Sequence, residues 1–265
     1  MGEDLRIALA AFAARPRVLV ALDFDGTLAP FVTDPLRARA VPGGLEALRA
    51  ATALGGVTTA VVSGRDLATL AMLTGIGPDE GITLIGSHGA QTNSGDRAEL
   101  VSATGAAFLD DAAAALLETL RDELEVIRSR YPAVRLEYKP AAVVLHTRDV
   151  EKSAADAATK AAHEAGRRLA GVHVMPGKEV VELSVSAADK GSSLAGLARA
   201  SSSDATLYVG DDVTDERAFA ALHPLSGDLT VKVGDGATVA VQRVPDPEAV
   251  VELLKLFVDV RRLQG

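Results

Sequence analysis

The sequence contains no cysteine, which excludes disulfides, zinc–thiolate sites and a cysteine nucleophile. Basic residues are also scarce relative to acidic ones, with 27 Lys and Arg against 36 Asp and Glu and a net charge of −9. This balance argues against a nucleic-acid-binding protein, because phosphate backbones are bound by a basic face. An acidic protein can still bind a single phosphate group locally, so a phosphorylated substrate remains possible.

Long apolar runs are absent as well. No uninterrupted run approaches the roughly 20 residues that a membrane-spanning helix requires, and the first 17 residues lack the basic region and cleavage pattern of a secretory signal. We therefore expect a soluble, cytoplasmic protein with no membrane partner and no nucleic-acid partner. A monomer is the simplest expectation for its assembly.

The chain does contain short apolar runs that alternate with helical patterns. Near-continuous Val, Leu and Ile content is typical of parallel strands buried on both faces. The alternation predicts an α/β fold whose core is a parallel, Rossmann-like sheet with helices on both faces. The predicted strands are 17–24, 56–63, 81–87, 205–210 and 229–234, and the predicted helices are 42–53, 65–73, 190–200, 215–222 and 246–263.

The middle of the chain has a different pattern. Two long helical stretches, 108–131 and 150–170, are each followed by two short stretches that alternate apolar and polar residues. This order predicts a small antiparallel sheet with helices on one face. We therefore expect a catalytic core formed by 1–104 and 187–265, interrupted by an inserted α+β cap at 105–186 that determines substrate specificity. The small-residue segments 102–105 and 184–189 are predicted joints between the two.

Polar residues follow four of the predicted core strands. Ligands of an open parallel sheet bind beyond the carboxyl ends of its strands, so these residues are expected to converge there. A lysine begins the helix that follows the insertion. In chain order the candidates are Asp23, Asp25, Ser63, Gly64, Arg65, His88, Lys190, Asp211, Asp212 and Asp215.

The pair Asp23 and Asp25 allows three interpretations. A calcium loop of the EF-hand type fails on register, because Gly26 follows the second aspartate directly and the twelfth position is Asp34 rather than glutamate. A plain acidic turn is less favoured, because the other strand ends supply matching partners. The third interpretation is a reactive carboxylate pair.

Clustered carboxylates repel one another unless a cation lies among them. The acidic strand ends therefore predict Mg²⁺, a hard ion that takes oxygen ligands. Lys190 and the Ser63 hydroxyl would hold a phosphoryl group, one carboxylate would attack phosphorus, and the other would transfer protons. Simpler roles stay open for several candidates. Asp215 suits a helix cap as well as a metal site, Arg65 suits a solvated surface as well as a substrate site, His88 suits a structural role and Gly64 a plain turn. Glu137 and Lys139 alternate on one strand and also suit an ordinary exposed face.

Four motifs together resemble the haloacid dehalogenase superfamily of phosphotransferases: "DFDGT", "VVSGRD", "DKG" and "VGDDVTDE". The "GDDxTDE" form with an inserted cap is similar to the sugar-phosphatase branch. More narrowly, "GSHG", "LEYKPAAVVLHTR" and "GKEVVELS" are similar to segments of the trehalose-6-phosphate phosphatases. The resemblance extends from about residue 17 to residue 260. One departure is the sequence His146-Thr147-Arg148, where the family commonly has His-Tyr-Arg.

The resemblance implies a role for each matched residue. Asp23 would be the nucleophile and Asp25 the general acid and base, and Ser63 and Lys190 would hold the phosphoryl group. Asp23, the Asp25 carbonyl and Asp211 would bind Mg²⁺, with Asp212 or Asp215 in support. Gly64, Arg65 and His88 would lie on the substrate side of the core. In the cap, the positions that would contact sugar hydroxyls are Glu137, Lys139, Lys178 and Glu182.

The implied activity is Mg²⁺-dependent hydrolysis of trehalose 6-phosphate to trehalose and phosphate through an aspartyl-phosphate. Another glycosyl phosphate is the nearest alternative substrate, such as sucrose phosphate or a glucosyl- or mannosyl-glycerate phosphate. A phosphomutase would use the same nucleophile but return the phosphate to the sugar. A non-catalytic sugar-phosphate-binding protein is the alternative from a different class, and the presence of both Asp25 and Lys190 argues against it.

Overall fold

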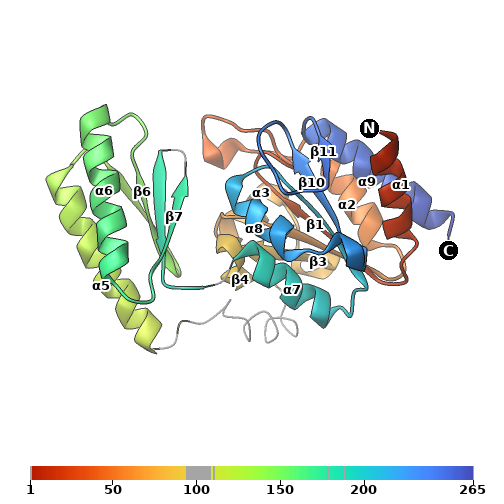
Figure 1. Cartoon of the computed structure of the whole chain (residues 1–265), viewed down its shortest axis with the longest axis horizontal. Helices are drawn as coiled ribbons and strands as arrows, with labels where there is room; N and C mark the ends of the chain where they lie inside the picture. The colour runs from red at the N-terminus through yellow and green to blue at the C-terminus, as the bar shows by residue number, and fades with distance from the viewer. Residues whose placement is uncertain (1, 94–108, 110, 178, 188, 265) are drawn as a thin grey trace. The chain divides into compact units, whose positions relative to one another are not determined.

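The computed structural model describes residues 2–93, 109, 111–177, 179–187 and 189–264. The chain divides into two compact units (Figure 1). We call Met1–Thr104 together with Ala188–Gly265 the core unit, and Gly105–Ala187 the inserted unit. The predicted joint at 102–105 lies outside the described residues.

The core unit contains a seven-stranded sheet in the order β11-β10-β9-β1-β2-β3-β4. All neighbouring strands are parallel except β4, which pairs antiparallel with β3 at one edge. The five predicted core strands are confirmed, whereas β4 and β11 are too short to show a pattern in the sequence. The strands are β1 (Val18–Asp23), β2 (Val57–Val62), β3 (Ile82–Gly86), β4 (Gln91–Thr92), β9 (Ala205–Gly210), β10 (Leu229–Val233) and β11 (Gln242–Val244).

Helices cover both faces of this sheet because the central strand is apolar on both sides. Val18, Val20 and Leu22 of β1 pack in one cluster with side chains of α1, α2, α3 and α9. The intervening Leu19 and Ala21 pack in another with α7 and α8. The helices are α1 (Glu3–Ala13), α2 (Gly44–Thr52), α3 (Leu67–Thr74), α7 (Lys190–Ala200), α8 (Val213–Ala221) and α9 (Pro247–Arg262), and short 3₁₀ turns are η1 (Pro35–Arg37), η2 (Pro78–Glu80), η3 (Ser87–Gly89) and η4 (Pro224–Ser226).

The strand order reverses at β1, and we call the region beyond the carboxyl end of this strand the crevice. The chain moves outward through β2 and β3 on one side of β1, and through β9, β10 and β11 on the other. The loops after β1, β2 and β9 therefore meet at the point where the order reverses, which is where open α/β sheets bind ligands. The core unit thus brings the predicted strand-end residues to one edge.

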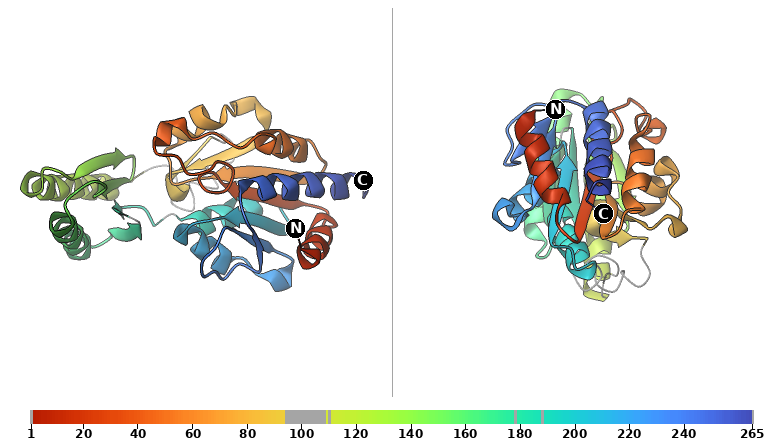
Figure 2. Two further views of the ribbon diagram at one scale, coloured as in Figure 1. Left: turned by 90° about the horizontal axis from the view of Figure 1, so that it is seen from above. Right: turned by 90° about the vertical axis from the view of Figure 1, so that its right-hand side faces the viewer.

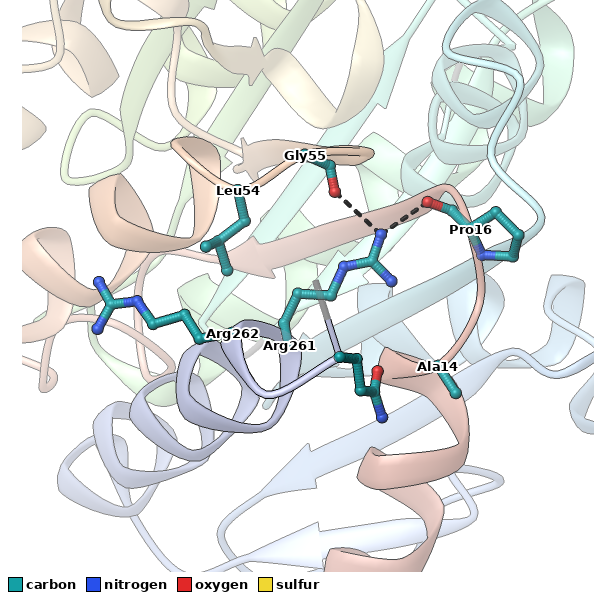
Figure 3. Close-up of a pocket in the computed structure, with 7 residues that line it drawn as sticks. Ala14, Pro16, Leu54, Gly55, Arg261 and Arg262 are labelled. Atoms are coloured by element: carbon teal, nitrogen blue, oxygen red, sulfur yellow. Dashed lines mark hydrogen bonds between the residues drawn. The ribbon is translucent and has the colours of Figure 1, made fainter.

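The opposite end of β1 is held by Arg261 of α9. Its guanidinium donates hydrogen bonds to the carbonyls of Pro16 at 2.6 Å and Gly55 at 2.9 Å (Figure 3). It also donates to the carbonyls of Ala13, at 2.6 Å, and Arg15. The terminal helices α1 and α9 lie side by side (Figure 2). The Arg261 pocket, of about 480 Å³, lies away from the crevice. It is lined by residues before β1 and β2 and by the C-terminal end of the chain: Ala14, Pro16, Leu54, Gly55, Arg261, Arg262 and Gln264.

The inserted unit is an α+β unit with one four-stranded antiparallel sheet in the order β5-β6-β8-β7. Both of its helices lie on the same face of the sheet (Figure 1). Its elements are α5 (Asp111–Arg130), β5 (Arg135–Lys139), β6 (Ala142–His146), α6 (Lys152–Arg168), β7 (His173–Gly177) and β8 (Val180–Ser184). Within the described part of the chain, no helix is both long enough and apolar enough to span a bilayer.

Candidate active site

The loop after β1 has a fixed conformation that presents two carboxylates. Asp23 is the last residue of β1, and the carbonyl of Phe24 accepts hydrogen bonds from the backbone N–H groups of Leu28 at 2.9 Å and Ala29 at 2.8 Å. Gly26 has a positive φ of 74°, and a Cβ there would lie 2.2 Å from Oδ2 of Asp211. Glycine is therefore required both for the turn and for the close approach of Asp211.

A buried lysine joins two of the predicted site carboxylates. Lys190 Nζ, at the start of α7, lies 2.8 Å from Asp23 Oδ2 and 2.7 Å from Asp215 Oδ1. The three side chains are nearly inaccessible to water, so each charge depends on the others for compensation. Burial alone would lower the pKa of Lys190, but the two carboxylates raise it. Burial raises the pKa of Asp23 well above its usual range, although Lys190 opposes that effect.

Asp215 is saturated with hydrogen bonds. Besides Lys190, its Oδ1 accepts the Tyr208 hydroxyl at 2.6 Å, and its Oδ2 accepts the backbone N–H groups of Asp211 and Asp212 at 2.9 Å each. Burial would raise the pKa of Asp215, but Lys190 and these hydrogen bonds outweigh it and lower the pKa. Both oxygens are thus committed to protein donors, and the carboxylate fixes the backbone that carries Asp211.

The Asp211 carboxylate makes fewer hydrogen bonds than that of Asp215, so it remains more available to a cation. Its Oδ1 lies 3.5 Å from the Thr27 hydroxyl, a weak contact. Burial, followed by the neighbouring charge of Asp215, raises the pKa of Asp211 to about 7. Oxygens of Asp23, Asp211 and Asp215 lie within 4.8 Å of one another and can hold a metal ion. Such a donor set suits a hard divalent cation, which would relieve the unfavourable burial of Asp23 and Asp211.

Asp212 takes a different place. Its side chain is exposed and accepts a hydrogen bond from the N–H of Val213 at 2.6 Å, as the N-cap of α8. It is not among the three described acidic residues whose oxygens converge. Between the two supporting candidates, the structure therefore places Asp215 within the cluster and Asp212 at the helix end.

Asp25 is paired with Arg65 from the turn after β2. Nε of Arg65 lies 2.6 Å from Oδ2 and Nη2 lies 2.7 Å from Oδ1, so the guanidinium bonds both carboxylate oxygens. The guanidinium also lies over the ring of Phe24, 5.9 Å from its centroid. Of the two interpretations open for Arg65, the solvated surface residue does not match this geometry.

The phosphate-side candidates Ser63, Gly64 and His88 come together through backbone contacts. Ser63 is buried, and its carbonyl accepts the N–H of His88 at 3.0 Å. A Cβ on Gly64 would lie 2.5 Å from the imidazole ring of His88. The loop holds Ser87 and His88 at positive φ angles of 49° and 55°. Strained backbone of this kind is retained where the surrounding structure over-determines it, often at functional sites.

The inserted unit gathers charged side chains on one face of its sheet. Lys139 Nζ lies 2.7 Å from Glu182 Oε2 in a buried ion pair, and His146 Nε2 lies 2.8 Å from Glu137 Oε2. Glu137 and Lys139 alternate with Tyr138, whose hydroxyl contacts Glu125 of α5, so they lie on the face away from the helices. The hydrogen bond from His146 lowers the pKa of Glu137. Lys178 lies outside the described residues.

Two residues near the core site were missed from the sequence. Tyr208 of β9 bonds Asp215, and Lys232 of β10 donates to the carbonyls of Asp211 and, at 2.9 Å, Val233. A tyrosine or a lysine inside a strand that is otherwise apolar is the available signal, since a buried hydroxyl or ammonium requires a partner. The Asp211 carbonyl that Lys232 reaches follows from strand register, with Lys232 opposite Gly210, whereas the partner of Tyr208 lies on α8.

Comparison with known proteins agrees with this geometry. Residues 21–245 match the family model described as trehalose-phosphatase. The chain belongs to the trehalose-phosphatase family. Trehalose-phosphate phosphatases of Mycobacterium tuberculosis and Mycobacterium bovis are 34% identical to it over 262 residues, covering 94% of this chain and 63% of the relative. The chain thus spans under two thirds of the length of these trehalose-phosphatase relatives.

Solved structures show the same fold. The C-terminal domain of Candida albicans trehalose-6-phosphate phosphatase aligns with a TM-score of 0.77 at 23% identity, covering 97% of each chain. A protein described as related to trehalose-6-phosphate phosphatase aligns with a TM-score of 0.68 at 26% identity, covering 93% of this chain and 100% of that one. The predicted α/β core with an inserted α+β unit is therefore confirmed as the fold of this trehalose-phosphatase family member.

Proposed function

We propose that this chain is a Mg²⁺-dependent phosphatase that hydrolyses trehalose 6-phosphate to trehalose and phosphate. The observation that carries the proposal is the placement of Asp23. Its carboxylate ends the central strand, contacts Lys190 at 2.8 Å, and has oxygens of Asp211 and Asp215 within 4.8 Å. Membership of the trehalose-phosphatase family and the names of the mycobacterial relatives support the choice of sugar phosphate.

Asp23 and Asp211 would hold the metal ion through their carboxylates, together with the backbone carbonyl of Asp25. Asp215 would act indirectly, because its oxygens already bond Lys190, Tyr208 and two backbone N–H groups. Bound Mg²⁺ would supply positive charge to the phosphoryl oxygens and offset the repulsion between the carboxylates.

The reaction would proceed in two displacements on phosphorus. In the first, Asp23 attacks phosphorus, the bond from phosphorus to the sugar oxygen breaks, and Asp25 gives a proton to that oxygen. In the second, Asp25 takes a proton from water as the water attacks, and the bond from phosphorus to Asp23 breaks. Lys190 and Ser63 would hold the phosphoryl oxygens while charge develops.

We propose that the inserted unit acts as the cap and binds the sugar. Glu137, Lys139 and Glu182 lie on the helix-free face of its sheet, where charged groups make strong hydrogen bonds to hydroxyls. Lys178 remains a prediction from the family resemblance, as do Gly64 and His88 on the core side, the cytoplasmic location and the monomeric state. Thr147, where the family commonly has tyrosine, makes another glycosyl phosphate the second candidate substrate.

A phosphate-release panel tests this proposal. Purified protein with Mg²⁺ is assayed on trehalose 6-phosphate, sucrose phosphate, glucosyl- and mannosyl-glycerate phosphates and glucose 6-phosphate. We expect the highest kcat/KM on trehalose 6-phosphate, and loss of turnover in the Asp23→Asn variant. A preference for another glycosyl phosphate would contradict the substrate. No release from any of them, with or without Mg²⁺, would contradict the activity, and full activity of Asp23→Asn would contradict the nucleophile.

A further inference from the structure

The ion pair between Asp25 and Arg65 engages the whole carboxylate. Each oxygen receives one N–H of the guanidinium, at 2.6 and 2.7 Å. The side chains are 28% and 15% exposed respectively, so the pair is partly shielded from solvent. A bidentate arginine fork fixes the plane of a carboxylate as well as its distance, which a lysine ammonium does not do.

Arg65 itself starts from a fixed backbone. Its N–H donates to the Ser63 hydroxyl at 3.2 Å, and its carbonyl accepts the N–H of Ser87 at 2.7 Å. Its side chain then passes over the ring of Phe24, the residue between the two loop carboxylates. The guanidinium is thereby anchored to the turn after β2 and aimed at the loop after β1, two segments 40 residues apart in the chain.

We propose that Arg65 is a positioning residue that acts through Asp25, and not the direct substrate-binding residue that the sequence predicts. The inference rests on the proposed function, in which Asp25 transfers the proton at the sugar oxygen. Without the fork, the Asp25 side chain would be free to turn about its two side-chain torsions and would face the sugar oxygen for only a fraction of the time. Misplacing a reacting group by about 1 Å is enough to cost about 100-fold in rate.

A double-mutant cycle separates positioning from direct binding. Arg65→Met keeps an unbranched apolar side chain and removes the fork, and Asp25→Ala removes the group that the fork holds. With saturating Mg²⁺ and trehalose 6-phosphate, we expect Arg65→Met to lower kcat by about 10- to 100-fold with little change in KM. In the Asp25→Ala background the same substitution should lower kcat by less than about twofold.

Two outcomes would overturn the inference. Equal losses in both backgrounds would show that Arg65 acts independently of Asp25, and a raised KM with unchanged kcat would show direct substrate binding. Arg49→Met is the matched control, because Arg49 makes a similar two-nitrogen contact with Glu80, at 2.5 and 3.4 Å, on η2 away from the crevice. Its kcat should remain at the wild-type level.

The leaving group provides a second readout. p-Nitrophenolate departs without a proton, so in the first turnover, before the aspartyl-phosphate is hydrolysed, Arg65→Met should slow p-nitrophenol release much less than it slows trehalose release. Equal losses in that first turnover would contradict positioning through Asp25, whereas the later hydrolysis step uses Asp25 as a base with both substrates. If Arg65→Met does not fold, Arg65→Lys replaces it in the double-mutant cycle, with a smaller expected loss of kcat.

Wild-type protein that is inactive on every sugar phosphate would refute the proposed function. An active wild type whose Arg65 and Asp25 variants have additive effects would refute only the role of Arg65.

Discussion

Replacing Asp211 by asparagine should make the metal-free protein more stable at alkaline pH. Burial raises the pKa of Asp211 to about 7 from an ordinary value of 3.8. In the folded protein this carboxyl therefore keeps its proton at pH values where the unfolded chain has lost it. A group with a raised pKa contributes stability that is present below the unfolded pKa and is lost as the pH rises through the folded one. The loss for Asp211 falls between about pH 4 and pH 7 and is complete near pH 8.

The size of the effect follows from the shift. Three pKa units correspond to about 4 kcal/mol as an upper limit. Asp211 is only partly buried, so screening by water reduces this figure, and we expect about 2 kcal/mol. For a folded unit of 150 to 250 residues, that amounts to a difference in Tm of about 4–8 °C. The pKa of Asp23 is also raised by burial. Because the substitution removes a neighbouring negative charge, it should lower the pKa of Asp23 and so add to the stability of the variant at alkaline pH.

Thermal melts from pH 5 to pH 9 in EDTA measure this difference. Relative to wild type, Asp211→Asn should gain Tm progressively above pH 5. The sign should reverse in Mg²⁺, because in the proposed site only wild type would bind the ion tightly and be stabilised by it. Asp79→Asn, an exposed change on η2, is the charge-matched control and should follow the wild-type curve. A metal-free Asp211→Asn protein that is no more stable than wild type at pH 8 would refute the reasoning.

Three further substitutions test neighbouring contacts. Lys232→Met should raise the Mg²⁺ dissociation constant about tenfold in calorimetry by releasing the Asp211 carbonyl; unchanged or tighter binding would mean that Lys232 acts only through its charge or not at all. Tyr208→Phe should cost about 1.5–3 kcal/mol in urea unfolding, since it removes a hydrogen bond to the buried charge of Asp215, and a cost under about 0.5 kcal/mol would contradict this. Gly64→Ala should lower kcat/KM because its Cβ would lie 2.5 Å from the His88 ring; adding His88→Ala should restore part of it, and no restoration would argue against this clash.

The sequence was sufficient to predict the core strands and the residues at their ends. Parallel strands buried on both faces are long apolar runs, and their carboxyl ends share one edge, so no tertiary information was needed to group Asp23, Ser63 and Asp211. The helix α1 was not predicted, although Leu5, Leu9 and Phe12 recur at helical spacing and are buried. The edge strands β4 and β11 have two and three residues, which is too short for a periodic pattern.

The pairings between side chains could not be predicted in the same way. That Asp215 rather than Asp212 faces Lys190 depends on where α8 begins, because the N-cap residue of a helix turns its side chain back to the backbone. That Lys232 reaches the Asp211 carbonyl depends on the register of β10 against β9. That Arg65 meets Asp25 depends on how far the loops after β1 and β2 extend beyond the ends of their strands. These are one-residue differences, which motif spacing does not resolve.

The distribution of charge at the crevice gives a reason for the metal that is independent of the family. Asp25 and Arg65 neutralise each other in their own pair. Three carboxylates then remain, those of Asp23, Asp211 and Asp215, against two buried ammonium groups, those of Lys190 and Lys232. With all three carboxylates ionised, the site would carry one excess negative charge before any substrate enters, and a phosphate dianion would bring the excess to three. A divalent cation returns the complex to a single excess charge. The lysines alone therefore leave the ionised carboxylates incompletely compensated, in line with the raised pKa of Asp211, and the proposed ion would also offset the charge that a phosphorylated substrate adds.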